Sequence, residues 1–162
     1  MKLSPLLKGT ITAIIMIAVS LATFYGLPPN SPLHYSVYGV YALGIVWTLM
    51  SYRNSPSFTG RFGESFGMGF RCFIVATLIM VVYTFVFNKM HPEFAEDAAR
   101  LYKEQQLAIK NNSKTPDEIV ADAARYKNGY AMAVVYGSIF GYLIIGAAVT
   151  AAVSGFLTRR NK

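Results

Sequence analysis

The chain has 162 residues, of which 54% are hydrophobic and only 14% are charged, and its formal net charge is +7. About a quarter of the residues of an ordinary soluble domain are charged, so the composition excludes such a domain and indicates that lipid is the solvent. The basic residues are scattered over the ends of apolar segments and form no compact stripe. We therefore expect no nucleic-acid partner.

Four apolar segments follow one another along the chain, at about residues 9–26, 33–52, 66–88 and 129–157. A helix of about 20 residues crosses the hydrocarbon core of a bilayer, and each segment is close to this length or longer. Spanning β-strands alternate in polarity over about ten residues, whereas these segments are apolar on every side. The sequence predicts an all-α, four-span transmembrane bundle that forms one membrane domain over residues 1–162.

The first segment is expected to remain in the protein as a helix. Lys2 and Lys8 give it a basic start, but the apolar stretch is long for a signal peptide and has no small-x-small cleavage site. The connection at 27–32 contains three prolines and no charge. It ends the first helix and predicts an immediate antiparallel return by the second.

Basic residues are distributed unevenly between the two sides of the predicted bundle. The side with both termini, the 53–65 loop and Arg71 carries eight basic residues and one acidic residue, whereas residues 89–128 carry seven of each. Lys and Arg near helix ends are retained in the cytoplasm. We expect both termini to lie inside and residues 89–128 to lie outside.

The polar segment 89–128 is predicted to form two helices. Pro92 and the acidic residues after it suit a first helical turn, and this helix should end at 111–113. A capping box with proline at N1, TPDE at 115–118, then begins a second helix. This helix continues into the fourth span as one helix over 116–157, with Gly129 as the position of any bend.

The first of these helices is amphipathic, and its apolar stripe has three interpretations. The stripe consists of Phe94, Ala98, Leu101, Gln105 and Ala108, flanked by Tyr102 and Ile109. In the first interpretation, the stripe packs against the second helix and covers it. In the second, the helix lies among the lipid headgroups. In the third, a membrane or periplasmic protein binds to Phe94, Leu101, Tyr102 and Ile109. Another face is predicted to carry an i,i+4 ladder of Glu96, Arg100 and Glu104.

Two stretches carry a family resemblance: SFGMGF at 65–70, which opens a spanning helix, and NKMHPEFAED at 88–97 after it. With the charged helical excursion that follows and a last helix closing on Arg159 and Arg160, the chain resembles the domain-of-unknown-function 4199 family. These are small inner-membrane proteins of bacteria, mainly Bacteroidota. The resemblance implies a four-helix integral protein of the bacterial inner membrane, and it implies no activity and no functional residues. In such a membrane, the orientation expected from the charges places 89–128 in the periplasm.

Catalytic, metal and cofactor chemistry has little support in the sequence. It contains no Ser-His-Asp set, no HExxH and no phosphate loop, so we expect no enzyme and no cofactor. His91 with Glu93 and Asp97 is a weak ligand set, and we expect no metal. Cys72, the only cysteine, is expected to pack in the interior, although its position near the cytoplasmic interface would permit acylation.

Arg71 is the one charge well inside an apolar segment, about two turns into the third. Glu64 lies on the same helical face, with Gly67 between them. We expect Arg71 to extend to the cytoplasmic interface. A Glu64–Arg71 pair that shapes a cytoplasmic entrance and an anion path are the alternatives.

Small residues recur on the fourth span, in a GxxxG pair and a repeat after it: Gly137, Gly141, Ala147, Ala151 and Gly155. Small residues let helices in lipid approach closely, so this face is predicted to pack on another helix of the chain or on a second copy. The sequence favours a non-enzymatic accessory or structural membrane protein with an external docking segment. The alternative is an oligomeric small transporter or channel subunit.

Overall fold

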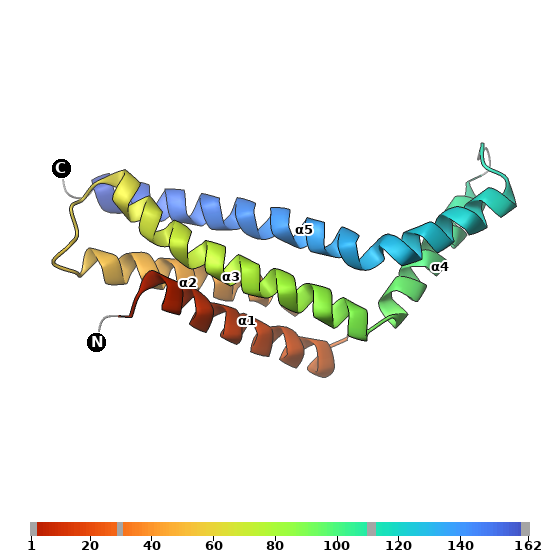
Figure 1. The fold of residues 1–162 in the computed structure, drawn as a ribbon, viewed down its shortest axis with the longest axis horizontal. Helices are drawn as coiled ribbons and strands as arrows, with labels where there is room; N and C mark the ends of the chain where they lie inside the picture. Colours follow the sequence, from red (N-terminus) through yellow and green to blue (C-terminus); the bar gives the residue numbers. More distant parts are fainter. Residues whose placement is uncertain (1–2, 29–30, 110–112, 160–162) are drawn as a thin grey trace. The chain divides into compact units, whose positions relative to one another are not determined.

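The computed structural model describes residues 3–28, 31–109 and 113–159, whose course Figure 1 shows. Every element of regular structure in these residues is helical, which confirms the predicted all-α class. The elements are α1 (Pro5–Gly26), a 3-10 turn η1 (Pro32–Tyr35), α2 (Ser36–Arg53), α3 (Phe62–Met90), α4 (Glu93–Ala108) and α5 (Pro116–Arg159).

Four stretches are long and apolar enough to cross a membrane: α1, η1 with α2, α3, and α5. Large aliphatic side chains point outward from each of them. The exposed fractions of Ile14, Leu43, Leu78 and Ile144 are 59%, 69%, 61% and 67%. Such a surface is unfavourable in water and suits lipid. The helices are consistent with a multi-pass integral membrane protein, as predicted.

The chain forms two compact units. The first, here called the bundle unit, comprises Met1–Val81 and Ile139–Lys162, and the second, the hairpin unit, comprises Val82–Ser138. Helices α3 and α5 contribute to both units, because they are 29 and 44 residues long, more than a bilayer requires.

Local sequence sets the ends of the first two helices in the bundle unit. Helix α1 begins at Pro5, before the predicted start at residue 9, because the Leu7 N–H donates a hydrogen bond to Ser4 Oγ (3.2 Å) and proline suits the first turn. A 3-10 turn precedes α2, and α1 and α2 pack against each other as predicted. Pro29 and Asn30 of the predicted connection lie outside the described residues.

Tyr41 on α2 joins three helices in the core of the bundle unit. Its side chain is fully buried. Its hydroxyl donates a hydrogen bond to the Tyr142 carbonyl of α5 (3.1 Å) and lies 3.0 Å from Thr77 Oγ1 of α3. In lipid the polar groups of a bundle must find their partners within the protein. This hydroxyl therefore fixes the relative positions of α2, α3 and α5 at one level.

Two glycines bring helices of the bundle unit into close contact. A methyl group added to Gly9 of α1 would collide with the Cys72 carbonyl oxygen of α3. One added to Gly146 of α5 would collide with Tyr41 and with the Phe73 ring. Neither glycine belongs to the predicted GxxxG pair, so the spacing of small residues did not indicate these two contacts.

The hairpin unit is built from the end of α3, from α4 and from the first part of α5. Helix α5 runs from Pro116 to Arg159 without a break, which confirms the single long helix predicted over 116–157. Helix α4 ends at Ala108, before the predicted end at 111–113, of which residues 111 and 112 lie outside the described part of the chain.

Candidate functional site

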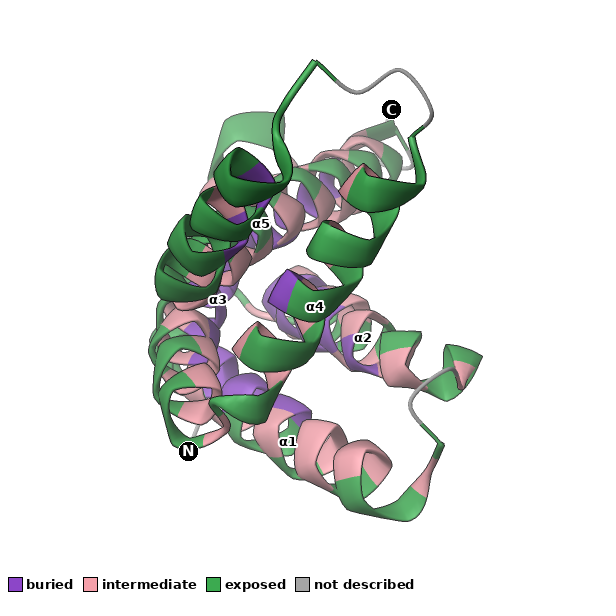
Figure 2. Cartoon of the chain, turned by 90° about the vertical axis from the view of Figure 1, so that its right-hand side faces the viewer, coloured by how far each residue is buried: buried purple, intermediate pink, exposed green. Residues whose placement is uncertain are grey.

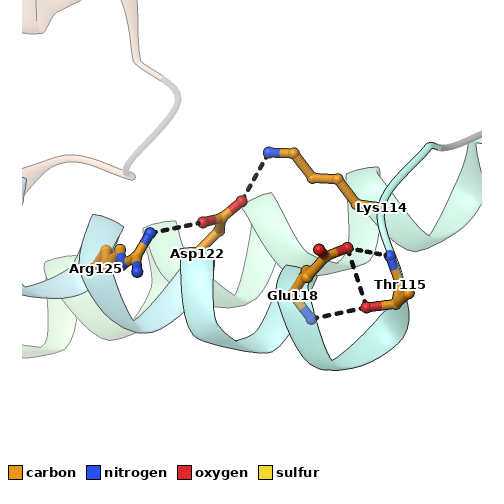
Figure 3. Close-up of polar contacts among 5 residues, drawn as sticks. All are labelled: Lys114, Thr115, Glu118, Asp122 and Arg125. Atoms are coloured by element: carbon orange, nitrogen blue, oxygen red, sulfur yellow. Dashed lines mark hydrogen bonds and ion pairs between the residues drawn. The ribbon is translucent and has the colours of Figure 1, made fainter.

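The best candidate for recognition is the polar hairpin formed by α4 and the first turns of α5. A reciprocal capping box fixes the start of α5 (Figure 3): the Thr115 N–H donates to Glu118 Oε2 (2.7 Å), and the Glu118 N–H donates to Thr115 Oγ1 (3.3 Å). These bonds confirm the predicted box. The turn before α5 is held by local chemistry that the sequence displays directly.

A carboxylate one turn further on holds two cations. The Asp122 carboxylate forms ion pairs with Lys114 Nζ (2.7 Å) and Arg125 Nη1 (3.7 Å), which Figure 3 shows. The hydrogen bond to the Asp122 carboxylate raises the pKa of the Lys114 ammonium. The contact joins the turn before α5 to the helix.

The contacts between α4 and α5 overturn the predicted charge ladder. Glu96 pairs with Lys127 of α5 (2.8 Å), and Arg100 pairs with Asp97 of its own helix (2.9 Å). Spacing alone predicts that Glu96, Arg100 and Glu104 bind one another. The neighbouring helix supplies a lysine that the spacing within α4 does not show.

The face of α4 that packs inward differs from the predicted stripe. Ala99 is buried, and the Tyr102 ring stacks on Tyr126 of α5 with centroids 5.4 Å apart. Leu101, on the predicted stripe, and Ile109, which flanks it, are 54% and 52% exposed. A shift of one residue turns a helix face by about 100°. The predicted docking set is thus divided, since Leu101 and Ile109 face outward whereas Tyr102 faces α5.

Phe94, the remaining residue of the predicted docking set, is half-buried in a group of aromatic side chains where α3 ends and α4 begins. Its ring lies 6.1 Å from that of Phe87 and 5.6 Å from that of His91. Figure 2 shows α4 exposed over most of its length beyond this point. The exposed apolar residues of the predicted set are therefore Leu101 and Ile109.

The weak metal set is not assembled. His91 Nδ1 lies 2.6 Å from Glu93 Oε1, while Asp97 binds Arg100. The Glu93 backbone N–H and the His91 ring lower the pKa of the Glu93 carboxyl. Over residues 3–28, 31–109 and 113–159, no group of three or more His, Cys, Asp or Glu side chains is placed to hold a metal ion.

The structure does not bring Glu64 and Arg71 together. The Glu64 carboxylate accepts hydrogen bonds from Thr59 Oγ1 (2.8 Å) and the Tyr52 hydroxyl (3.2 Å), and Arg61 lies 3.8 Å from it. Arg71 is exposed, and no ion pair joins it to Glu64 in the part of the chain that the structure describes. The loop before α3 folds back on the helix start and supplies closer partners for Glu64.

The predicted packing residues of α5 lie in different surroundings. Ala147 and Ala151 are half-buried. A Cβ on Gly141 would lie 3.7 Å from the Tyr38 hydroxyl, whereas a Cβ on Gly137 or Gly155 would meet no atom within 4 Å. A packing role for Gly137 and Gly155 stays a prediction.

Almost the whole chain matches a known protein family. Residues 8–160 match the family described as "Protein of unknown function (DUF4199)". The chain belongs to this family. The match confirms the resemblance that residues 65–70 and 88–97 indicate. No curated protein and no solved structure gives a significant match, so functional inference for this DUF4199 protein rests on its own geometry.

Lys8 of this DUF4199 protein has surroundings that the sequence did not reveal, whereas Cys72 is packed as predicted. Lys8 is only 8% exposed, and its Nζ lies 5.3 Å from the centre of the Trp47 ring. The position of a lysine one turn inside a capped apolar helix is the only feature of the sequence that could have indicated the burial of Lys8. Cys72 is fully buried, with Thr48 donating to its sulfur (3.2 Å), as expected for a packed cysteine.

Proposed function

We propose that this DUF4199 protein is a non-enzymatic accessory or structural protein of the bacterial inner membrane that binds another protein through α4. The observation that carries the proposal is the exposure of Leu101 and Ile109 on a polar hairpin. The hairpin is stabilised by its own cap, by the Lys127–Glu96 pair and by the tyrosine stack. It does not require these two apolar side chains for its own packing.

A protein surface suits α4 better than lipid headgroups do. Helices that lie on anionic membranes are rich in Lys and Arg on their polar face. Helix α4 carries four acidic and two basic residues, so an anionic membrane would repel it. We infer a partner with an apolar patch, which is a membrane or periplasmic protein.

The charges of the hairpin support a structural role over a catalytic one. Glu118 belongs to the cap, Asp122 holds Lys114, and Glu96 holds Lys127. Catalytic carboxylates are usually gathered in a concave site that shifts their pKa values. Glu96 and Glu118 are exposed and Asp122 is half-buried, and each of the three has a helix-stabilising partner.

We further propose that both termini are cytoplasmic and that the hairpin is periplasmic, since the basic excess lies with the termini. Single cysteines introduced at Asn54, in the loop after α2, and at Lys103, on α4, test this orientation because both positions are exposed. A membrane-impermeant maleimide applied to cells with a permeabilised outer membrane should label Lys103→Cys. It should label Asn54→Cys only after the inner membrane is disrupted.

The native Cys72 is fully buried, so the unsubstituted protein serves as the background control for labelling. The opposite pattern, in which Asn54→Cys reacts in intact inner membranes and Lys103→Cys does not, would overturn the orientation.

The docking proposal predicts that Leu101→Gln separates the protein from its partner. Removal of an apolar anchor from the centre of an interface typically costs more than about 1 kcal/mol, so affinity should fall about tenfold. The measurement is the mass and composition of the intact complex from gently solubilised membranes at native expression. Ile109→Gln should have an effect in the same direction.

Lys103→Gln is the matched control, because it places the same side chain on an exposed position of the same helix. A second polypeptide that is bound in stoichiometric amount, retained by Lys103→Gln and lost from Leu101→Gln, supports the proposal. Equal retention by both variants contradicts it.

A second candidate is an oligomeric small transporter or channel subunit. Gly137 and Gly155 favour it, because within the described residues a Cβ added at either position would meet no atom within 4 Å, so a second copy could approach there. The same mass measurement separates the candidates. A complex that contains only copies of this chain favours the second and directs attention to flux in reconstituted vesicles.

A further inference from the structure

A cleft of about 520 Å³ opens in the bundle unit where α1 and α3 begin and α2 ends. One wall is polar and comes from the end of α2 and the loop after it, with Ser51, Asn54, Ser55 and Ser57. The other wall is largely apolar. Its side chains include Leu3, Pro5, Trp47 and Met68.

Among the residues that the structure describes, Lys8 is the one charged residue that lines this cleft. The residue as a whole is 8% exposed, and its ammonium lies over the Trp47 ring. Within the described residues, no carboxylate lies at ion-pair distance from Lys8. The nearest acidic residue in the following loop and helix, Glu64, is bound by Tyr52, Thr59 and Arg61. A buried ammonium without a counter-charge is unfavourable, and an anion in the cleft would relieve this cost.

The polar wall is suited to phosphate oxygens. Ser55 Oγ lies 3.2 Å from Ser57 Oγ and accepts a hydrogen bond from the Ser57 N–H (3.3 Å), so the loop is held in place by its own contacts. Hydroxyl and amide groups can donate to an anion, and the described residues of the lining include no carboxylate that would repel it. An ammonium with several neutral donors is a common way to bind phosphate.

The apolar wall indicates where the phosphate comes from. Trp47, on a helix consistent with a membrane span, is 40% exposed on the rim of the cleft, and Leu3, just before α1, is 38% exposed there. Tryptophan favours the headgroup level of a bilayer. A ligand that fits both walls carries a phosphate next to an apolar body.

We propose that this cleft binds the phosphate of a membrane lipid headgroup, with Lys8 as the counter-charge. This binding site is independent of the docking role of α4. Through this cleft, the bundle unit would bind a specific lipid at one interface of the membrane.

Titration of phosphatidylglycerol against the purified full-length protein in mild detergent, followed by thermal unfolding, tests the site. Lipid should raise the unfolding temperature of the wild type. Lys8→Met should weaken lipid binding about tenfold or more, because a charge-assisted hydrogen bond is lost. Without lipid, Lys8→Met should unfold at the same temperature as the wild type or higher, since a buried charge has been removed.

Lys89→Met is the matched control. Lys89 also lies over an aromatic ring, that of Phe85 at 5.9 Å, but it is exposed and does not line the cleft. It should bind lipid as the wild type does. Asn54→Leu, which removes an amide from the exposed loop wall, should weaken binding in the same direction and serves if Lys8→Met fails to fold.

The same titration with glycerol 3-phosphate and with inorganic phosphate tests whether soluble phosphates bind. Binding of phosphatidylglycerol alone, lost in Lys8→Met, supports the lipid. Binding of the soluble phosphates with similar affinity, also lost in Lys8→Met, supports the phosphate site and assigns it to a soluble compound. Equal binding of every probe by the wild type, Lys8→Met and Asn54→Leu overturns the proposal.

Discussion

Replacing Tyr41 with alanine is expected to lower the free energy of unfolding by about 3–5 kcal/mol, the usual cost of truncating a large buried aromatic side chain. Tyr41 is fully buried, and its hydroxyl contacts Thr77 and the Tyr142 carbonyl. The truncation would leave a cavity between α2, α3 and α5 and two polar groups without this partner. Reversible unfolding by dodecyl sulfate in mixed micelles measures the loss.

Two further variants divide this effect into its parts. Tyr41→Phe keeps the ring and removes the hydroxyl, so it should cost about 0.6 kcal/mol and at most about 1.7 kcal/mol, the average and the maximum measured for hydrogen bonds between membrane helices. Tyr35→Ala, at a side chain that is 72% exposed, is the control for loss of a tyrosine and should have a small effect. A loss for Tyr41→Ala no greater than that for Tyr35→Ala would show that Tyr41 does not pack in the core.

Gly9→Ala is expected to cost about 1–3 kcal/mol, as overpacking of a close contact does. The added methyl group would overlap the Cys72 carbonyl oxygen. That oxygen belongs to the backbone of α3, so it cannot move aside as a flexible side chain would, and α1 and α3 must separate. The same unfolding assay measures this loss.

Gly39→Ala in α2 is the matched control, because a Cβ there meets no atom within 4 Å. In water-soluble helices the change from glycine to alanine favours the helix by up to about 1 kcal/mol, so no loss is expected. If Gly9→Ala is as stable as Gly39→Ala, the two helices do not approach as closely as the structure indicates.

Features that depend on nearby residues were predictable from the sequence. Thr115 and Glu118 are three residues apart, and their reciprocal bonds form as the pattern predicts. The absence of a proline or a turn signal after Pro116 correctly predicted one helix to the end of the last span. Hydropathy over about 20 residues likewise gave the four long apolar helices.

Features that depend on a second helix were not predictable in the same way. The partner of Glu96 is Lys127, 31 residues away, and the partner of the Tyr102 ring is Tyr126. The apolar residues of α4 are spread widely enough that two neighbouring faces are plausible on pattern alone. The stacking of Tyr102 on Tyr126 of α5 determines which of the two faces packs inward, and Leu101 lies on the exposed face.

The sequence by itself determined the all-α class, the number of long apolar helices, the cap of α5 and the position of the polar hairpin. Only the tertiary structure decided which residues lie between the helices, including Gly9, Gly146 and Lys8. The physical reason is the composition of the membrane-crossing segments. Helices bound for lipid are apolar on the face toward lipid as well as on the face toward their neighbours, so hydropathy does not show their rotation. Contacts such as that between Lys8 and Trp47 are set by that rotation.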